Sequence, residues 1–510
     1  MPRHSPAATP LVVVDNLARA PLWRQIYDQL RDAIVSGRLA AGTQLPASRV
    51  LANDLVVSRN SVNAAYEQLR AEGYLEQRER LGSFVAAVLP DVAARPQARP
   101  ATVRGAKAGA HPAPPRHADL SITGSVFVRA AERLSRSRQL GDWATPLAFR
   151  IGDPAIDAFP VPLWSRLVAR RWRSGQVALG YSDPAGVMEL RRAIADYLRA
   201  SRGVRCDPEQ VFIASGTQQA LDLATRLVLS PNDSVWVENP GYPGARSAVE
   251  GAGAVAIPVN VDNEGLSVEH GIQMCDNARG VYVTPSHQFP LGAVMSVARR
   301  LALLSWAEKA GAWIFEDDYD SEFRYASRPL PSLQGLDEHG RVIYTGTFSK
   351  TLFPALRLAY VVSPPALVDA FRAACILGGR YAPTDAQLVV TDFINEGHFE
   401  RHLRRMRALY AARQHALLDC VHELLGDSLA VAPSAAGLHL VAWLKNASLD
   451  AVEVSARAAD AGVEISPLAN YTLTPMARDG FLMGYGAYEP AVMRAAATKL
   501  AAVLGETSRR

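Results

Sequence analysis

Apolar residues recur at helical spacing near the start of the chain. The positions that share one face of the segment 22–36 are Leu22, Ile26, Leu30, Ala33 and Ile34. Steps of three and four residues place them on one side of an amphipathic helix. Gly37 follows directly and favours the end of that helix. We therefore expect a helix from about residue 22 to residue 36.

Two further helices follow in the pattern. The first begins at Ser48, whose side chain can cap it, and runs to about Leu55. After a turn at Val56–Val57, the second begins with Ser58 or Asn60 as its cap. The apolar residues of its inner face are Val62, Ala65, Tyr66 and Leu69.

A short hairpin completes the N-terminal region. Gly73 ends the preceding helix, and the apolar stretches 74–75 and 83–85 flank a polar tip. Helix, helix, turn, helix and hairpin is the order of a winged helix-turn-helix, which places a short helix in the DNA major groove. The side chains expected to meet phosphates and base edges are Arg49, Ser58, Arg59, Asn60, Ser61, Asn63, Arg78 and Arg80. The alternative is a dimerisation or protein-binding module, which the near balance of eight Arg against seven Asp plus Glu in 21–86 slightly favours.

Beyond residue 118, short apolar runs alternate with long amphipathic segments. The runs are 211–215, 234–238, 280–285, 312–317 and 341–346. Apolar strands that alternate with helices predict an α/β domain with a mainly parallel sheet. The segment before it is rich in Ala, Pro and Arg and has little apolar periodicity, which is typical of a linker. We therefore predict a DNA-binding domain at 21–86, a linker at 87–118 and an α/β domain at 119–510.

Composition narrows the class of protein. A chain of 510 residues is too long for one ordinary domain, and 49% hydrophobic with 20% charged residues is typical of a soluble globular protein. We expect no membrane span, because no run of 18 apolar residues occurs, and no secretory signal. Four widely spaced cysteines predict neither a disulfide framework nor a zinc site, and they fit the cytoplasm. A net charge of +4 does not by itself indicate a nucleic-acid partner.

Two segments of the α/β region can hold parts of a flat, phosphorylated ligand. Ser215, Gly216 and Thr217 follow a predicted strand and open a helix, where free backbone N–H groups bind anions. The same residues can also be a simple helix cap. Tyr242 lies in the turn 238–243, where its ring can lie against a heterocycle or pack on its own loop.

Two more segments offer polar groups at strand ends. In the loop 284–292, either His287 or Gln288 can donate a hydrogen bond to a phenolate oxygen. Asp317 and Tyr319 share one side of an extended chain, so one can meet a ring nitrogen and the other a ring hydroxyl. An acidic cluster also suits Mg²⁺, but no Gly-rich phosphate-chain motif accompanies this one, and we expect no metal.

Lys350 is the candidate for covalent chemistry. The chain has only five lysines, at positions 107, 309, 350, 445 and 499. Lys350 follows a predicted strand and is flanked by hydroxyl residues. An amine in such a setting can form an aldimine with an aldehyde cofactor. Thr347, Ser349 and Arg357 can hold that cofactor's phosphate.

The N-terminal region resembles the GntR family of winged-helix regulators. The residues that match its pattern are Leu45-Pro46, Arg49, Leu51-Ala52, Leu55, Val57-Ser58-Arg59, Val62, Ala65-Tyr66, Leu69 and Gly73. Val56 stands where that family has a turn glycine, and the wing reads RLGSFV (80–85) where the family has GSGTFV. The resemblance implies binding to double-stranded DNA.

The five segments of the C-terminal region, in their order, resemble the fold-type I pyridoxal phosphate (PLP) enzymes of the aspartate aminotransferase group. The resemblance implies that Lys350 carries the cofactor as an internal aldimine. It also implies that Tyr242 stacks on the ring, that Asp317 pairs with the pyridine nitrogen and that Tyr319 binds the ring hydroxyl. The implied phosphate cup is Ser215, Gly216, Thr217, Thr347, Ser349 and Arg357. Tyr181 matches a tyrosine that reaches the partner subunit's phosphate, which implies a homodimer.

Both halves together resemble the MocR/GabR subfamily of GntR regulators. The phrases NPGYPG, TPSHQFPLG, EDDYDSEF, GTFSKTLFPALRL and AGLHL are typical of it. The implied function is transcription regulation that senses PLP or a small amine or amino-acid effector through the Lys350 aldimine. The alternative is a working PLP-dependent aminotransferase with an accessory DNA-binding head. Between residues 458 and 490 the only arginine is Arg478, so the arginine that binds the substrate α-carboxylate in such enzymes stays unassigned.

Overall fold

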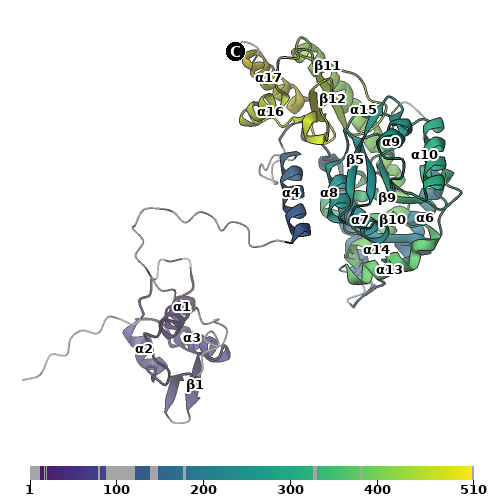
Figure 1. The fold of residues 1–510 in the computed structure, drawn as a ribbon. Helices are drawn as coiled ribbons and strands as arrows, with labels where there is room; N and C mark the ends of the chain where they lie inside the picture. The colour runs from purple at the N-terminus through teal and green to yellow at the C-terminus, as the bar shows by residue number, and fades with distance from the viewer. Residues whose placement is uncertain are drawn as a thin grey trace, which may run out of the picture. The chain divides into compact units, whose positions relative to one another are not determined.

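The computed structural model divides the chain into two units, residues 1–114 and 115–510. Both are drawn in Figure 1. The structure describes residues 12–15, 18, 20–78, 81–87, 121–137, 147–175, 180–325, 330–378 and 382–507. Within these ranges, no helix combines the length and the apolar character needed to cross a bilayer.

The N-terminal unit contains three helices and a hairpin (Figure 1). They are α1 (Leu22–Val35), α2 (Ser48–Asp54), α3 (Arg59–Ala71), β1 (Leu75–Arg78) and β2 (Gly82–Val85). The two strands pair antiparallel, with Leu75 opposite Val85. One small core gathers the apolar faces of α1 and α3 and includes the predicted Ile26, Leu30, Val62 and Leu69. The predicted winged helix-turn-helix is therefore confirmed.

A side-chain cap marks the start of α3, but not the starts of α1 and α2. Ser58 caps α3, because its Oγ accepts a hydrogen bond from the backbone N of Ser61 at 3.1 Å. The prediction that Ser48 caps α2 is wrong. Ala47 takes the extended backbone of the N-cap, so Ser48 is already the first helical residue and makes no capping bond.

Val56 lies in the turn between α2 and α3 with φ of +54°, and its side chain is 87% exposed. A β-branched residue in the left-handed region is strained, since its Cβ crowds the following carbonyl. We expect Val56→Gly to stabilise the N-terminal unit by about 1 kcal/mol. Amide hydrogen exchange of α2 and α3 in the full chain measures this change.

The matched control is Val50→Gly, since Val50 is exposed within the regular helix α2. Glycine there is expected to destabilise the unit by about 0.5 to 1 kcal/mol. If Val56→Gly also destabilises it, the turn is not strained at residue 56.

An eight-stranded sheet forms the centre of the C-terminal unit, in the order β3-β10-β9-β8-β7-β4-β5-β6. Its strands are β3 (Val211–Ala214), β4 (Ser234–Asn239), β5 (Val255–Asp262), β6 (Gly265–Leu266), β7 (Gly280–Val283), β8 (Trp313–Asp318), β9 (Val342–Thr347) and β10 (Ala359–Val362). The five predicted apolar runs are the strands β3, β4, β7, β8 and β9. Strands β5, β4, β7, β8 and β9 pair parallel, whereas β10 is antiparallel to β9 and to β3. The predicted α/β fold with a mainly parallel sheet is confirmed.

Helices cover both faces of this sheet (Figure 1). One face packs on α7 (Thr217–Val228), α8 (Pro243–Gly251) and α13 (Val368–Leu377). Helices of the other face include α6 (Met188–Arg202), α9 (Val268–Met274), α10 (Val297–Ala310) and α14 (Thr384–Asn395). Strands covered on both faces carry continuous apolar runs, which is why such runs predicted them.

A second, four-stranded antiparallel sheet, here the small sheet, lies in the C-terminal part of this unit. Its order is β11 (Leu429–Val431), β12 (His439–Leu444), β14 (Gly480–Gly484) and β13 (Ser466–Pro467). Its helices are α15 (His398–Leu425), α16 (Ala451–Asp460) and α17 (Pro490–Thr507). The other helices are α4 (Ile122–Ser137), α5 (Val161–Arg173), α11 (Leu333–Leu336), α12 (Phe348–Thr351) and the short 3-10 turns, of which η5 (Leu468–Tyr471) matters below.

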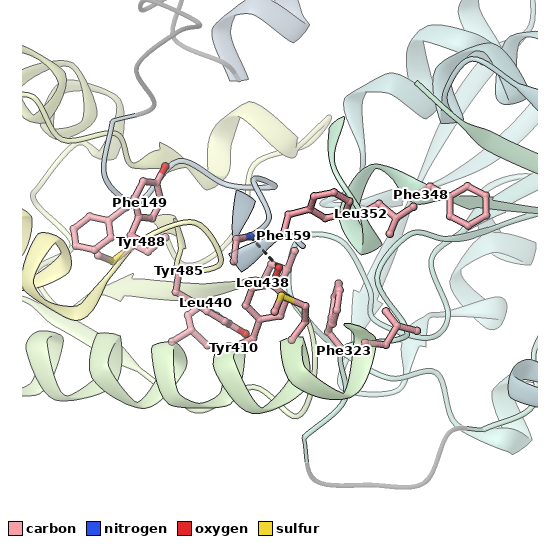
Figure 2. Close-up of a cluster of buried hydrophobic side chains, with 14 of the residues drawn as sticks. Phe149, Phe159, Phe323, Phe348, Leu352, Tyr410, Leu438, Leu440, Tyr485 and Tyr488 are labelled. Atoms are coloured by element: carbon pink, nitrogen blue, oxygen red, sulfur yellow. Dashed lines mark hydrogen bonds between the residues drawn. The ribbon is translucent and has the colours of Figure 1, made fainter. Parts of the chain in front are cut away.

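One core joins the small sheet to the large one (Figure 2). Leu440 of the small sheet and Leu438, just before β12, belong to the same cluster as Phe348 and Leu352, which flank Lys350. Tyr410 of α15 lies within it and accepts a hydrogen bond from the backbone N of Ala155 at 3.0 Å. The turn that bears Lys350 is therefore fixed by packing against the small sheet's side of the unit.

Candidate cofactor and DNA-binding sites

Lys350 lies in the short helix α12, directly after β9, and is half-buried. Its Nζ donates a hydrogen bond to the carbonyl of Gly152 at 2.5 Å. Gly152 has φ of +83°, which strains any other residue, and a Cβ there would lie 2.7 Å from this Nζ, so the amine would have to move. The sequence reasoning did not single out Gly152. The Gly-Asp-Pro turn at 152–154 was the available signal.

Two of the residues predicted for the phosphate cup lie side by side at the ends of the neighbouring strands β3 and β10. Gly216 is the N-cap of α7, and a Cβ there would lie 3.2 Å from Nη2 of Arg357. The Arg357 guanidinium therefore lies against the N-terminus of α7, which begins at Thr217. Free backbone N–H groups and a guanidinium at one corner favour an anion.

The hydroxyl residues of the predicted cup lie in the segments on either side of that corner. Ser215 directly precedes Gly216, and its backbone N donates to Gln219 Oε1 at 2.6 Å. Thr347 ends β9, and its Oγ1 accepts from the backbone N of Ser349 at 3.1 Å. These contacts fix the backbone around the cup. The assignment of each hydroxyl to a phosphate stays a prediction.

Asp317 is buried near the end of β8. It accepts a hydrogen bond from the Tyr282 hydroxyl at 2.7 Å and lies 3.4 Å from the hydroxyl of Thr345. Burial raises the pKa of Asp317 to about 7, since it outweighs the hydrogen bond from Tyr282, and the charge of Asp318 raises the pKa further. A protonated ring nitrogen beside this carboxyl would stabilise its ionised form.

His287 and Tyr319 form one hydrogen-bonded group. The Nδ1 of His287 lies 3.0 Å from the Tyr319 hydroxyl and 3.0 Å from Oδ2 of Asp320. Gln288 instead stabilises its own loop, since its amide donates to the carbonyls of Pro240 and Phe289. The predicted contacts of His287, Gln288 and Tyr319 with a cofactor stay predictions.

Phe289 is a further residue that the sequence reasoning missed, although it lies in the TPSHQFPLG phrase. Its ring centre lies 6.0 Å from that of Tyr242 and 6.1 Å from that of Tyr319. On its other sides it contacts His439 at 5.6 Å and Tyr471 at 5.3 Å. Phe289 therefore joins the predicted cofactor residues to the small sheet.

Tyr242 and Tyr181 differ in their surroundings. Tyr242 is half-buried, and its hydroxyl donates to Gln218 Oε1 at 3.4 Å. Tyr181 is 87% exposed on the described subunit. A residue that reaches a partner subunit has to be exposed on its own subunit. This role of Tyr181 stays a prediction.

The candidate DNA-binding side chains lie at the start of α3 and around it. Ser58, Arg59 and Asn60 are exposed, whereas Ser61 and Asn63 are half-buried. Arg49 is exposed on α2. Arg78 is exposed on the wing, where its guanidinium stacks on the Phe84 ring at 4.6 Å. Arg80 lies outside the described residues.

The buried acids of the site make the cofactor-free protein sensitive to pH. The folded-state pKa of Asp317, about 7, exceeds its ordinary value of 3.8. The folded state favours the protonated carboxyl. The stability that depends on this proton is therefore fully present below about pH 4 and is lost as the pH rises to about 7. When the pH is raised from 5 to 8, the free energy of unfolding falls in both proteins. We expect the fall to be about 2 kcal/mol smaller for Asp317→Asn than for the wild type.

Urea unfolding of the cofactor-free chain at the two pH values measures this difference. Burial also raises the pKa of Glu238 and Glu316 to about 7, so the variant keeps part of the pH dependence. Asp196→Asn, at an exposed position of α6, is the control and is expected to follow the wild type. Equal slopes for Asp317→Asn and the wild type would contradict the role of Asp317.

Family models match both units. Residues 22–85 match the bacterial regulatory proteins of the gntR family, and residues 147–481 match aminotransferase class I and II. The "Probable rhizopine catabolism regulatory protein MocR" of Rhizobium meliloti is 42% identical over 488 residues, which cover 95% of this chain and 94% of that protein. The chain belongs to the MocR/GabR subfamily of GntR regulators.

Other relatives support this MocR-type identity along the whole chain. The "HTH-type pyridoxine biosynthesis transcriptional regulator PdxR" of Corynebacterium glutamicum is 30% identical over 476 residues, covering 92% of this chain and 93% of that protein. The aminotransferase LysN of Thermus thermophilus, solved with N-(5'-phosphopyridoxyl)-L-leucine, is 27% identical, with a TM-score of 0.67. It covers 76% of this chain and 98% of its own. The predictions of a DNA-binding transcription regulator and of a PLP-binding aminotransferase-like domain are confirmed.

Proposed function

We propose that this MocR-type regulator holds PLP at Lys350 and changes its DNA binding when a small primary amine reaches that lysine. The protein acts as a cytoplasmic homodimer with the domain bounds 21–86, 87–118 and 119–510. The position of Lys350 carries the proposal. It lies in a turn fixed by the core, and this turn is joined to the Arg357 segment by the hydrogen bond from the backbone N of Phe348 to the carbonyl of Leu358 at 3.0 Å. When bound, PLP supplies an aldehyde that joins reversibly to a primary amine.

The residues of the site fit this cofactor. Arg357 and the N-terminus of α7 would hold its phosphate, because both present donors to an anion. Asp317 would hold a proton on the ring nitrogen, and the half-buried Tyr242 would orient the ring. Tyr319 with His287 would bind the ring hydroxyl. A Tyr181 from the partner subunit would complete the phosphate contacts.

A route toward the linker follows from the contacts of the site. The segment 149–153 contains the Gly152 carbonyl that accepts from Lys350, and Phe149 accepts from the backbone N of Gly484 at 2.8 Å. A change in the partner of Lys350 is therefore transmitted to the small sheet. Helix α4, the first described helix after the predicted linker, packs on α8 and η5. Tyr471 of η5 accepts from the backbone N of Gly241, next to Tyr242, at 2.8 Å.

Gel-shift experiments with the chain's own promoter region test the proposal. We expect the affinity of the PLP-loaded protein for DNA to change when primary amines are added. A second candidate ligand is PLP itself. It is tested as well, because the name of the relative PdxR refers to pyridoxine biosynthesis. If neither PLP nor any amine changes DNA binding, both versions are refuted. Steady transamination without DNA binding would instead favour the aminotransferase alternative.

The DNA-binding helix is tested by Arg59→Ala. Arg59 is exposed at the first position of α3, where base edges and phosphates are met. We expect at least about a tenfold loss of operator affinity, since a good arginine contact contributes about 1 to 3 kcal/mol. Arg70→Ala, exposed at the other end of α3, is the control and is expected to bind DNA nearly as the wild type does. Equal effects of the two substitutions would contradict the assigned face.

A further inference from the structure

A cavity of about 150 Å³ lies between α8 and the segment 469–473, which contains the end of η5. A cavity of this volume accepts a molecule about the size of benzene. Its walls are formed by residues 237–238, 241–243, 246, 282 and 469–473. Lys350, Asp317 and the predicted phosphate cup are not among the described residues that line it, whereas Tyr242 is. The cavity is therefore a neighbour of the candidate cofactor site and shares one ring with it.

Hydrogen bonds join the two walls of the cavity. The backbone N of Gly241, next to Tyr242, donates to the carbonyl of Tyr471 at 2.8 Å. The buried Asn239 accepts from the backbone N of Leu473 at 2.7 Å, and its amide donates to the hydroxyl of Thr474 at 2.7 Å. These bonds fix the separation of the walls, so the cavity is preformed, as most small-molecule sites are.

Arg246 is the one cation among the described residues that line the cavity. It lies on α8, its side chain is 28% exposed, and its Nε donates to Oε1 of Glu250 on the next turn of the helix at 2.6 Å. Within the described part of the chain, its two Nη groups donate no hydrogen bond. A guanidinium whose outer nitrogens are unengaged matches the two oxygens of a carboxylate. The cavity therefore favours an anion of this kind.

The rest of the lining suits an anion that has an apolar body. Glu238 is the one acid among the described lining residues, and its two oxygens accept from the backbone N and the hydroxyl of Thr284 at 3.2 and 2.6 Å. Burial also raises the pKa of Glu238 to about 7, which reduces its negative charge at neutral pH. The hydroxyls of Tyr242 and Tyr282 already donate to side chains outside the lining. These rings and Leu473 therefore offer apolar contacts beside Arg246.

Helix α4 packs on α8 and on η5, the elements on the two sides of the cavity, and it lies beside α8 in Figure 1. Its packing is light. Among the described side chains of α4, only Ala130 is buried. Phe127 is 53% exposed, and a Cβ on Gly251 of α8 would lie 3.3 Å from its ring. A ligand that joins the two walls would therefore stabilise the surface on which the first described helix after the predicted linker packs.

We propose that this cavity is a second effector site, which binds a small carboxylate with an aromatic or branched apolar body. The carboxylate pairs with the Nη groups of Arg246, and the body lies against Tyr242 and Leu473. The bound molecule joins α8 to the segment 469–473 and so strengthens the packing of α4. Because no amine has to react at Lys350, this site is separate from the amine sensor of the proposed function.

Matched pairs of probes test the site on the full, PLP-loaded chain. The pairs are benzoate with benzamide, and isobutyrate with isobutyramide, which differ in charge but hardly in size. Titration calorimetry gives each dissociation constant. We expect each carboxylate to bind at least about tenfold more tightly than its amide, since a hydrogen bond between charged groups contributes that much. Equal binding within both pairs, or no binding of either carboxylate at millimolar concentrations, would overturn the proposal. The amine sensor is unaffected by either result, because none of the probes carries an amine that can join PLP.

Two substitutions locate the binding. Arg246→Gln removes the cation, and we expect it to weaken the carboxylates at least about tenfold while leaving the amides unchanged. The matched control is Arg226→Gln, because Arg226 pairs with Asp222 one helical turn away on α7, outside the cavity, and it should bind as the wild type does. Ala469→Trp fills the cavity from an exposed position and should weaken all four probes. Carboxylate binding that survives both Arg246→Gln and Ala469→Trp would place it elsewhere and overturn the site.

Amide hydrogen exchange tests the link to α4. With benzoate bound, the amides of α4 are expected to exchange more slowly in the wild type, and to stay unchanged in Arg246→Gln at the same benzoate concentration. Exchange in α4 that does not respond when benzoate is bound to the wild type would contradict the link between the cavity and this helix.

Discussion

Lys350→Ala is expected to abolish the visible absorbance band of the PLP-loaded protein and the response of DNA binding to amines. In the proposed function the lysine supplies the amine that attaches the cofactor. Its segment lies beside that of Arg357, because the backbone N of Phe348 donates to the carbonyl of Leu358 at 3.0 Å. Phosphate contacts alone leave the cofactor reversibly bound. The expected loss of the band is therefore complete after gel filtration, whereas folding is retained because the side chain is only half-buried.

The control for this variant is Lys309→Ala, since Lys309 is exposed near the end of α10. It should keep the band and the amine response. Spectra of both proteins, with circular dichroism to verify folding, make the comparison. A band that persists in Lys350→Ala and fails in Lys309→Ala would move the covalent site to another lysine.

Arg202→Met is expected to destabilise the C-terminal unit by about 3 to 5 kcal/mol, because it leaves Asp318 buried without its cation. The Nε of Arg202 lies 2.7 Å from Oδ2 of Asp318, and both side chains are buried. Burial alone raises the pKa of Asp318, but Arg202 and the hydroxyl of Tyr344 outweigh it and hold that pKa below its usual value. The stability from Asp318 is therefore present at neutral pH and is lost as the pH falls through that lowered pKa.

Urea unfolding monitored by tryptophan fluorescence measures this loss. Arg199→Met is the control, because Arg199 pairs with Asp196 on the exposed side of α6, and we expect a loss below about 1 kcal/mol. The double variant Arg202→Met with Asp318→Leu should recover much of the loss, since it removes both charges. A loss for Arg202→Met that equals the loss for Arg199→Met would show that the buried pair contributes no more than an exposed one.

The sequence predicted those elements whose signal is local. The strands at 280–283 and 313–318 contain continuous apolar runs, 281–283 and 313–315, because helices cover both faces of the sheet. Ser58 was found as a cap because its partner, Ser61, is three residues away. The predicted cap of α2 was wrong by one residue. The extended backbone of Ala47 decides where this helix begins, and no capping side chain marks that position.

The site was predicted less completely, because its parts come from distant segments. Asp317 was identified at a strand end, and its neighbour Asp318 points to the opposite side, where Arg202 on α6 meets it. Gly152 lies close to Lys350 only because segments 198 residues apart meet in the fold. The small sheet likewise pairs residues such as Val441 and Leu482, which are far apart in sequence. Periodicity along one segment carries no information about such contacts.

The antiparallel strand β10, between β3 and β9, has a practical consequence for handling the protein. Because β3 and β9 both run opposite to β10, their carboxyl ends share one edge of the sheet with those of β4, β7 and β8. The loops after these strands, which carry most of the predicted cofactor residues, therefore project from that edge, and the amino ends of the same strands are remote from it. The exposed residues 338–340, just before β9, are thus a position for a fluorescent reporter that would leave the ligand chemistry undisturbed.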